Sequence, residues 1–302
     1  MWQQEYWADK GGVKLFMFRK RLDAPAAGEA PRPVLFLVHG SSFSGPSGFD
    51  LHVPGKSDYS LMEKFAEYGF DVWTLDHEGY GRSDRTEGNS AIAEGARDLH
   101  AGMAVVTRET GVASAAFYGS SSGALRAAAF ADRHPEYVER LALDAFVWTG
   151  EGSPTLKERA KKLDQWKASN TRPVDRPFFH SIFNRDMPGT SEEGVADALA
   201  DRELKLCDSV PTGTYLDMCA NLPVCDPTKV TCPVLIIRGE HDGIATEEDL
   251  LAYFQALPNG DKQFFVIPGG AHVSFLGVNR ARFWHVLRDF LTLPARIDTL
   301  GE

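Results

Sequence analysis

The chain has 302 residues, of which 43% are hydrophobic and 25% are charged, and this supplies enough apolar material for one large folded domain with an inserted subdomain, or for two domains of average size. Its 42 acidic residues outnumber its 32 basic residues and give a net charge of −10. This charge opposes binding to nucleic acid or to an anionic membrane surface, so neither partner is expected.

Short apolar runs alternate with helical stretches along most of the chain, which is typical of parallel strands joined by crossover helices. The first two runs flank a turn at residues 9–12 and predict an antiparallel hairpin. Most of the later runs are continuous, as expected for strands buried on both faces. The expected strands are residues 5–7, 13–19, 34–38, 70–75, 115–118, 141–143, 234–237 and 263–267.

The stretches between these runs carry helical patterns, and several begin with capping residues. The expected helices are residues 59–68, 90–110, 124–134, 247–257 and 279–291. Together the elements predict an α/β fold, with a mostly parallel eight-stranded sheet and helices on both of its faces.

Residues 148–228 interrupt this alternation, because they show no strand signal and mix Pro, Trp and Phe with charged helical segments. Two such segments are residues 156–166 and 191–206. A loop of this length without structure of its own would be unusual in a compact domain. We therefore expect a helical lid inserted after the sixth strand, and a core domain made of residues 1–147 and 229–302.

A GxSxG pattern, residues 119–123, lies between an expected strand and an Ala-rich helix, as in a nucleophile elbow. So tight a turn strains the backbone of its middle residue and requires small flanking residues. The middle serine then stands at a helix N-terminus, where free N–H groups favour negative charge. This context predicts Ser121 as a nucleophile.

Two further segments follow strands and reach the same edge of the sheet as Ser121. Asp242 lies just after the strand 234–237, and His272 ends a glycine-rich loop after the strand 263–267. The order Ser, Asp, His fits a catalytic triad with His272 as general base and Asp242 as the orienting acid. Glu240, and Asp144 at the end of the strand 141–143, remain alternatives for the acid.

The segment His39-Gly40-Ser41-Ser42 directly follows the strand 34–38, where an oxyanion-hole donor is expected. The donors would be backbone N–H groups of Ser41, or of Ser42 as the close second choice, together with Ser122 after the nucleophile. His39 is interpreted as a packing residue that fixes this loop. The histidines show no paired ligand spacing, so no catalytic metal is expected.

These segments resemble the successive signatures of the α/β-hydrolase superfamily with a helical cap, and the likeness runs from about residue 13 to 293. The segments are residues 38–40, 76–83, 119–123, 239–242 and 270–272. The resemblance implies hydrolysis of an ester, lactone, thioester or related acyl bond through an acyl-enzyme, without a cofactor. The elbow departs from many relatives in holding three consecutive serines.

The leading hypothesis is a hydrolase of ester or lactone bonds in a small or medium, partly apolar acyl substrate. Alternatives are a carbon–carbon bond hydrolase or an acyltransferase with the same triad, or a non-catalytic ligand receptor of this fold. Several large side chains are candidates for the substrate pocket, although most are expected to form the core of the lid. The candidates are His39, Trp148, Trp166, Phe178, Phe179, Phe183, Tyr215 and Met218.

The expected cellular compartment is inferred from the first 21 residues, the apolar stretches and the cysteines. Residues 1–21 mix charges into apolar residues, unlike a secretory signal, and no stretch approaches the length of a membrane-spanning helix. The four cysteines show no CxxC spacing, which argues against a zinc site or a disulfide framework. We expect a cytoplasmic protein, with a homodimer as one candidate state.

Overall fold

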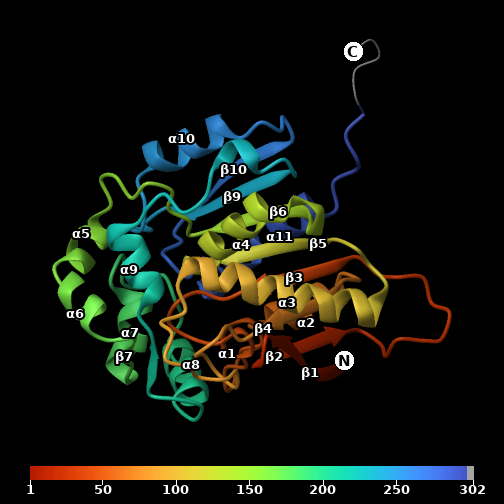
Figure 1. Ribbon diagram of the computed structural model, residues 1–302, viewed down its shortest axis with the longest axis horizontal. Helices are drawn as coiled ribbons and strands as arrows, with labels where there is room; N and C mark the ends of the chain where they lie inside the picture. Colours follow the sequence, from red (N-terminus) through yellow and green to blue (C-terminus); the bar gives the residue numbers. More distant parts are fainter. Residues whose placement is uncertain (298–302) are drawn as a thin grey trace.

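The computed structural model describes residues 1–297, and a single large sheet runs through its centre (Figure 1). Within these residues the sheet has eight strands in the order β1-β2-β4-β3-β5-β6-β9-β10. The hairpin β1–β2 and the pair β2–β4 are antiparallel, and every other neighbouring pair is parallel. The mostly parallel eight-stranded sheet expected from the sequence is therefore confirmed.

All eight expected strands are present in this sheet. Their bounds are β1 (Trp2–Lys10), β2 (Val13–Arg21), β3 (Val34–Val38), β4 (Asp71–Leu75), β5 (Ala115–Ser120), β6 (Val138–Asp144), β9 (Val234–Gly239) and β10 (Lys262–Ile267). Strands β3, β4 and β5 are buried along their whole length, which explains their continuous apolar runs. Several strands extend beyond the predicted runs because polar residues, such as Ser120 and Asp144, also pair at their ends.

Helices cover both faces of the sheet. Helices α3 (Ile92–Thr110), α4 (Ser122–Arg133) and α10 (Glu247–Ala256) share one apolar core, and α1 (Gly45–Phe49), α2 (Leu61–Glu67) and α11 (Arg280–Leu291) share the other. The five predicted helices are therefore present, with ends that shift by up to two residues. Helix α1 was not predicted because five residues are too few to show a helical period.

The segment between β6 and β9, which the structure describes throughout, lies at one end of the sheet (Figure 1). We call residues 148–228 the insertion. It holds the helices α5 (Pro154–Ala160), α6 (Leu163–Ala168), α7 (Arg176–Asn184), α8 (Val195–Glu203) and α9 (Gly213–Ala220), and the strands β7 (Thr171–Pro173) and β8 (Ser209–Pro211).

Three expectations about the insertion were wrong in detail. The predicted helix 156–166 is two helices, because α5 ends just before a turn at residues 161–162. The predicted helix 191–206 is confined to α8, which starts after Gly194 in a left-handed conformation. The antiparallel pair β7–β8 has only three residues in each strand and contains prolines, so it left no strand signal in the sequence.

Two polar contacts of buried residues join the insertion to the loop after β3. The Glu203 carboxylate accepts hydrogen bonds from Ser44 N–H at 3.1 Å and from Ser44 Oγ at 2.8 Å. Arg172 Nη2 donates to the Ser41 carbonyl oxygen at 2.8 Å. The loop is therefore held between the sheet and the insertion.

Two further features concern the helices and the cysteines. No helix within residues 1–297 is long and apolar enough to cross a membrane. All four cysteines, Cys207, Cys219, Cys225 and Cys232, are free thiols.

Candidate active site

Ser121 forms the sharp turn between β5 and α4. Its backbone has φ 58° and ψ −126°, which lies outside the conformations that side chains ordinarily favour. A Cβ on Gly119 would come within 2.5 Å of the Gly123 carbonyl oxygen, and one on Gly123 within 2.1 Å of the Val38 carbonyl oxygen. Both glycines are therefore required by close backbone approach, and the turn they allow presents the serine side chain at the edge of the sheet.

The side chains of Ser121, His272 and Asp242 form one hydrogen-bonded line. His272 Nε2 lies 3.0 Å from Ser121 Oγ, and His272 Nδ1 lies 2.9 Å from Asp242 Oδ1. Asp242 Oδ1 also accepts the Ile244 N–H at 3.0 Å. Because a carboxylate holds the proton on Nδ1, Nε2 is the nitrogen that can accept a proton from the serine.

Asp242 is suited to stay ionised although it is only 2% exposed. Burial alone would raise its pKa, but attraction to His272, the hydrogen bond to that ring and the Ile244 N–H together lower the pKa below its ordinary value. The charge of Arg185 acts in the same direction. A lowered pKa keeps the group that orients His272 negatively charged.

The two alternative acids have other partners. Asp144 is fully buried under the elbow, where it accepts the Tyr118 hydroxyl at 2.8 Å. Burial, together with the nearby Asp242, raises the pKa of Asp144 to about 7. Glu240 is exposed and accepts the Gly269 N–H at 2.7 Å. The structure therefore brings His272 together with Asp242, and neither Asp144 nor Glu240 is bonded to its ring.

The loop expected to supply oxyanion donors lies directly against the elbow. A Cβ on Gly40 would lie 3.3 Å from the Cβ of Ser121. Ser41 and Ser42 line the cavity at Ser121, and Ser122 begins α4, where the first N–H groups have no partner within the helix. The three residues expected to supply these donors therefore lie beside Ser121, and Arg172 binds the Ser41 carbonyl oxygen.

His39 is fully buried behind this loop. Its Nδ1 lies 2.7 Å from the Gly40 carbonyl oxygen, and its Nε2 accepts the His77 N–H at 2.9 Å. Burial, with the charge of Arg126 and the neighbouring His77, lowers the pKa of His39 well below its ordinary value. His39 thus fixes the loop as a neutral imidazole, and its placement among the pocket candidates was wrong.

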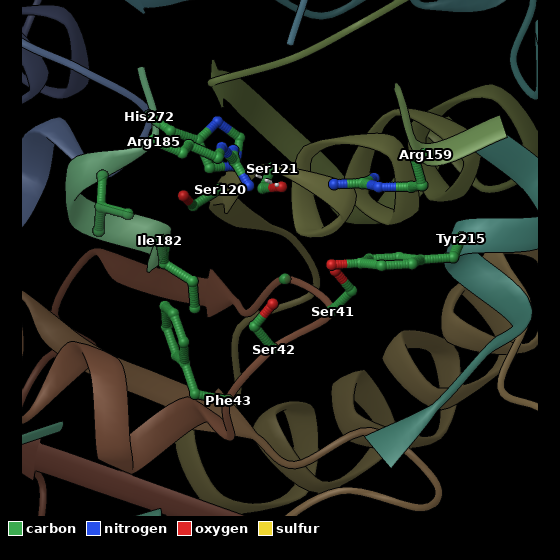
Figure 2. Close-up of a pocket in the computed structure, with 12 residues that line it drawn as sticks. Ser41, Ser42, Phe43, Ser120, Ser121, Arg159, Ile182, Arg185, Tyr215 and His272 are labelled. Carbon is green, nitrogen blue, oxygen red and sulfur yellow. Dashed lines mark hydrogen bonds between the residues drawn. The ribbon is translucent and has the colours of Figure 1, made fainter. Parts of the chain in front are cut away.

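The cavity beside Ser121 is lined from two sides, as Figure 2 shows. The core contributes Gly40, Ser41, Ser42, Phe43, Ser120, Ser121, His272 and Val273, and the insertion contributes Arg159, Ile182, Arg185 and Tyr215. Its free volume of about 20 Å³ is comparable to that of a single water molecule. In this conformation the space beside Ser121 holds no group much larger than a water molecule.

Most of the predicted pocket side chains lie elsewhere, and only Tyr215 lines this cavity. Trp166 and Phe178 line a larger hollow outside it, which we call the entrance. Phe179 and Phe183 are buried in the apolar core that the insertion shares with the sheet. Apolar composition alone does not tell a core side chain from a pocket wall, which is why Phe179 and Phe183 were wrongly expected to line the pocket.

Trp148 and Met218 also lie away from the cavity at Ser121. The Trp148 ring packs edge-on against Tyr253 at 5.9 Å between centroids, and Met218 is 3% exposed on α9. Both side chains instead belong to the packing that joins the insertion to the core.

Tyr215 stands among arginines that the sequence did not single out. Its ring centroid lies 3.8 Å from the guanidinium carbon of Arg159 and 4.1 Å from that of Arg172. Burial opposes ionisation, but the charges of Arg172, Arg159 and Arg185 outweigh it and lower the pKa of Tyr215 to about 7. The insertion side of the cavity is therefore strongly positive.

Two groups within residues 1–297 bring potential metal-ligand atoms within 4.8 Å of one another. One combines Asp186 with Asp242 and His272, and the latter two already bond to each other. The other is formed by Asp50, His52 and Glu63. Lys20 pairs with both of the carboxylates in this second group.

Comparisons with known proteins agree with this architecture. The family model described as serine aminopeptidase, S33, matches residues 47–276. Among solved structures, the enol-lactonase from Burkholderia xenovorans LB400 has a TM-score of 0.65 at 21% identity, covering 95% of this chain and 100% of its own. No curated protein sequence matches this chain.

Two other solved structures are similar over nearly the whole chain. E-2-(acetamidomethylene)succinate hydrolase has a TM-score of 0.66 at 19% identity, with 97% of this chain and 100% of its own covered. A serine hydrolase from the polyaromatic hydrocarbon-degrading bacterium Cycloclasticus zankles has a TM-score of 0.68 at 14% identity, with 96% and 98% covered. These likenesses show a shared fold.

Proposed function

The chain belongs to the serine aminopeptidase S33 family of α/β-hydrolases, and we propose that it hydrolyses an ester or lactone bond of a small or medium, partly apolar acyl substrate. The observation that carries the proposal is the line of hydrogen bonds from Ser121 Oγ to His272 Nε2, at 3.0 Å, and from His272 Nδ1 to Asp242, at 2.9 Å. Such a line is what acyl transfer through a serine nucleophile requires.

In the proposed reaction, Ser121 Oγ attacks the substrate carbonyl carbon while its proton passes to His272 Nε2. The oxygen of the tetrahedral intermediate gains negative charge, which the N–H groups of Ser41 or Ser42 and of Ser122 stabilise. The protonated His272 then donates its proton to the leaving group, and an ester of Ser121 remains. Water, deprotonated by His272, attacks this acyl-enzyme and releases the acid.

The apolar part of the substrate would contact the side chains that flank Ser121 on both sides. Phe43, Ile182 and Val273 line the cavity and are each less than one tenth exposed. Burying a few methylene groups against them contributes roughly 0.8 kcal/mol for each group. This favours substrates whose acyl chain is at least partly apolar.

We propose that the insertion, residues 148–228, acts as a cap over a catalytic core made of residues 1–147 and 229–302. The insertion supplies Arg159, Ile182, Arg185 and Tyr215 to the cavity, whose free volume is about 20 Å³. So small a space admits a substrate only after the cap opens, and its closure would exclude bulk water during acyl transfer.

A fluorophosphonate probe tests this function, because it labels only a serine that an adjacent base activates. We expect stoichiometric labelling of the folded wild-type chain and strongly reduced labelling of His272→Ala. Labelling of the Ser122 or Ser120 hydroxyl, or none at all, would contradict the proposal. A non-catalytic receptor with a silent serine would also remain unlabelled.

A further inference from the structure

The charged side chains of the cavity at Ser121 are unusual in having one sign. Arg159 and Arg185 both line it, and no carboxylate does so among the described residues. In Figure 2 the Arg159 side chain extends from the insertion toward Ser121. A hydrolase that acted only on neutral acyl chains would gain nothing from guanidinium groups at this place, since desolvating them costs free energy.

Arg159 has no carboxylate partner within residues 1–297. Its guanidinium stacks on the Tyr215 ring at 3.8 Å, and its hydrogen bond to another side chain goes to Met218 Sδ at 3.5 Å. Burial, with the nearby Arg185 and Arg172, lowers the pKa of Arg159. Since arginine stays protonated in proteins even so, Arg159 presents to the cavity a positive charge that no carboxylate pairs with and that only the ionised form of Tyr215 balances.

Arg185 is only partly neutralised. Its Nε lies 3.4 Å from Asp186 Oδ2, which is at the long end of a hydrogen bond. The guanidinium also lies close enough to Asp242 to lower the pKa of that buried acid. A second guanidinium therefore acts on the catalytic side of the cavity.

The entrance carries the same sign of charge. It encloses about 960 Å³ and shares Arg159, Arg185 and Tyr215 with the cavity at Ser121. Four cationic side chains line it, Arg159, Lys162, Arg172 and Arg185, against the carboxylates of Glu158 and Asp186. The chain as a whole has a net charge of −10. A positively charged entrance in such a chain concentrates anions near the cavity and speeds their association.

Tyr215 reports the strength of this positive potential. A buried phenol normally resists ionisation, yet the three arginines lower its pKa to about 7. The cavity therefore stabilises a negative charge at the position of the Tyr215 oxygen. The same field acts on any anionic group that a substrate brings into the cavity.

We infer that the acyl substrate carries a carboxylate, which Arg159 binds with help from Arg185 while Ser121 attacks the ester or lactone carbonyl. This inference rests on the proposed function and narrows its substrate class. Guanidinium groups match carboxylates geometrically and bind them through short, charge-assisted hydrogen bonds.

The same positive charges oppose aminopeptidase activity, the reaction after which the family is named. An aminopeptidase must bind the positively charged N-terminal ammonium group of a peptide next to the scissile bond, and carboxylates are the side chains that do this. Arg159 and Arg185 occupy the cavity instead, so a cationic substrate terminus would be repelled. We expect aminoacyl 4-nitroanilides to be poor substrates.

Two aryl esters with the same acyl-chain length test the inference. Mono-(4-nitrophenyl) adipate carries a free carboxylate, whereas 4-nitrophenyl hexanoate is neutral. After subtraction of the spontaneous rate, we expect the wild type to show a kcat/KM at least about tenfold higher for the adipate ester, as one charge-assisted contact provides. This preference should shrink as NaCl is added, because salt screens the entrance.

The variants Arg159→Gln and Arg185→Gln should each reduce the ratio of the two kcat/KM values toward one, with the larger loss in Arg159→Gln. Arg159→Lys should keep part of the preference that Arg159→Gln loses, because lysine keeps the positive charge but lacks the planar guanidinium that donates two parallel hydrogen bonds. Lys167→Gln is the matched control, since Lys167 is an exposed cation on α6 that lines neither the cavity nor the entrance. It removes the same charge and should leave the ratio as in the wild type.

A wild-type ratio near one, or an equal loss of preference in Lys167→Gln and Arg159→Gln, would overturn the anionic-substrate inference. If the serine still reacts with the fluorophosphonate probe, the proposed function survives that result. If the wild type hydrolyses neither ester, calorimetric titration with adipate decides whether the protein has a carboxylate-binding site. Saturable binding that Arg159→Gln abolishes supports the carboxylate site, and absence of binding in the wild type overturns it.

Discussion

The two sides of the cavity at Ser121 are built differently. On the core side, Ser121, Asp242 and His272 each follow a parallel strand, β5, β9 or β10, at the same edge of the sheet. On the insertion side, Arg159 and Tyr215 lie on the short helices α5 and α9, which lie beyond the end of the sheet (Figure 1).

In our proposal, the core side carries out the reaction and the insertion side selects the substrate. Ladder hydrogen bonds and two buried apolar cores hold the strands rigidly, so the core side can fix hydrogen-bond distances near 3 Å. The insertion contributes charge and shape from short helices that lie outside the sheet. Substitutions on the core side should therefore abolish turnover of every ester, whereas those on the insertion side should change which ester is preferred.

The largest effect is expected for Ser121→Ala. Loss of the nucleophile should lower kcat by a factor on the order of 10³ or more for neutral and anionic esters alike. Steady-state kinetics with both aryl esters measure this, and an unchanged melting temperature shows that the fold is intact. Substantial retained turnover would mean that another group performs the attack.

Asp242→Asn should be nearly as damaging, because an amide can stabilise the wrong tautomer of His272 and cannot balance its positive charge. We expect kcat to fall on the order of 10³-fold. Asp144→Asn is the matched control, since both acids are buried at the same edge but only Asp242 bonds to His272. Its kcat should change by less than about tenfold, and the reverse order would assign the acid role to Asp144.

An intermediate effect is expected for Arg172→Met, which tests the junction between the two sides. Arg172 belongs to the insertion but donates to the Ser41 carbonyl oxygen at 2.8 Å. Losing a charged hydrogen bond that positions an oxyanion donor should lower kcat about tenfold for both esters, and loss of one cation from the entrance should lower the ratio of their kcat/KM values only in part. A selective loss of the anionic ester would place Arg172 in substrate binding instead.

The smallest effect is spectroscopic and concerns the insertion side alone. One of the eight tyrosines should ionise near pH 7, because the arginines around Tyr215 lower its pKa to about 7. Absorbance at 295 nm should then rise by one tyrosinate as the pH passes through this value. Tyr215→Phe should remove the step, and Arg159→Gln should move its midpoint to higher pH. A titration without this step would show that the positive potential is weaker than we infer.

The core side could be read from the sequence because each of its parts leaves a local signature. A continuous apolar run marks a buried strand, and the glycines at residues 119 and 123 mark the close backbone approach around Ser121. Since parallel strands end at one edge, the meeting of Ser121, Asp242 and His272 followed from their positions after strands.

The insertion side left no comparable signature. Arg159 is one cation among several in a charged helical segment, and only the folded arrangement shows that it faces Ser121 while Lys167 faces solvent. Phe179 and Met218 have the composition of pocket residues but pack into cores. The direction in which a side chain points depends on how short helices dock, which their sequence period does not determine.

Trapping the acyl-enzyme tests the central claim most directly. Rapid acid quenching during turnover of mono-(4-nitrophenyl) adipate, followed by peptide mass spectrometry, should reveal the adipoyl group attached to Ser121. The Ser121→Ala protein should carry no such adduct. An acyl group found on another residue during turnover would contradict the account. The hydrogen bonds through His272 and Asp242 would then not activate the attacking group.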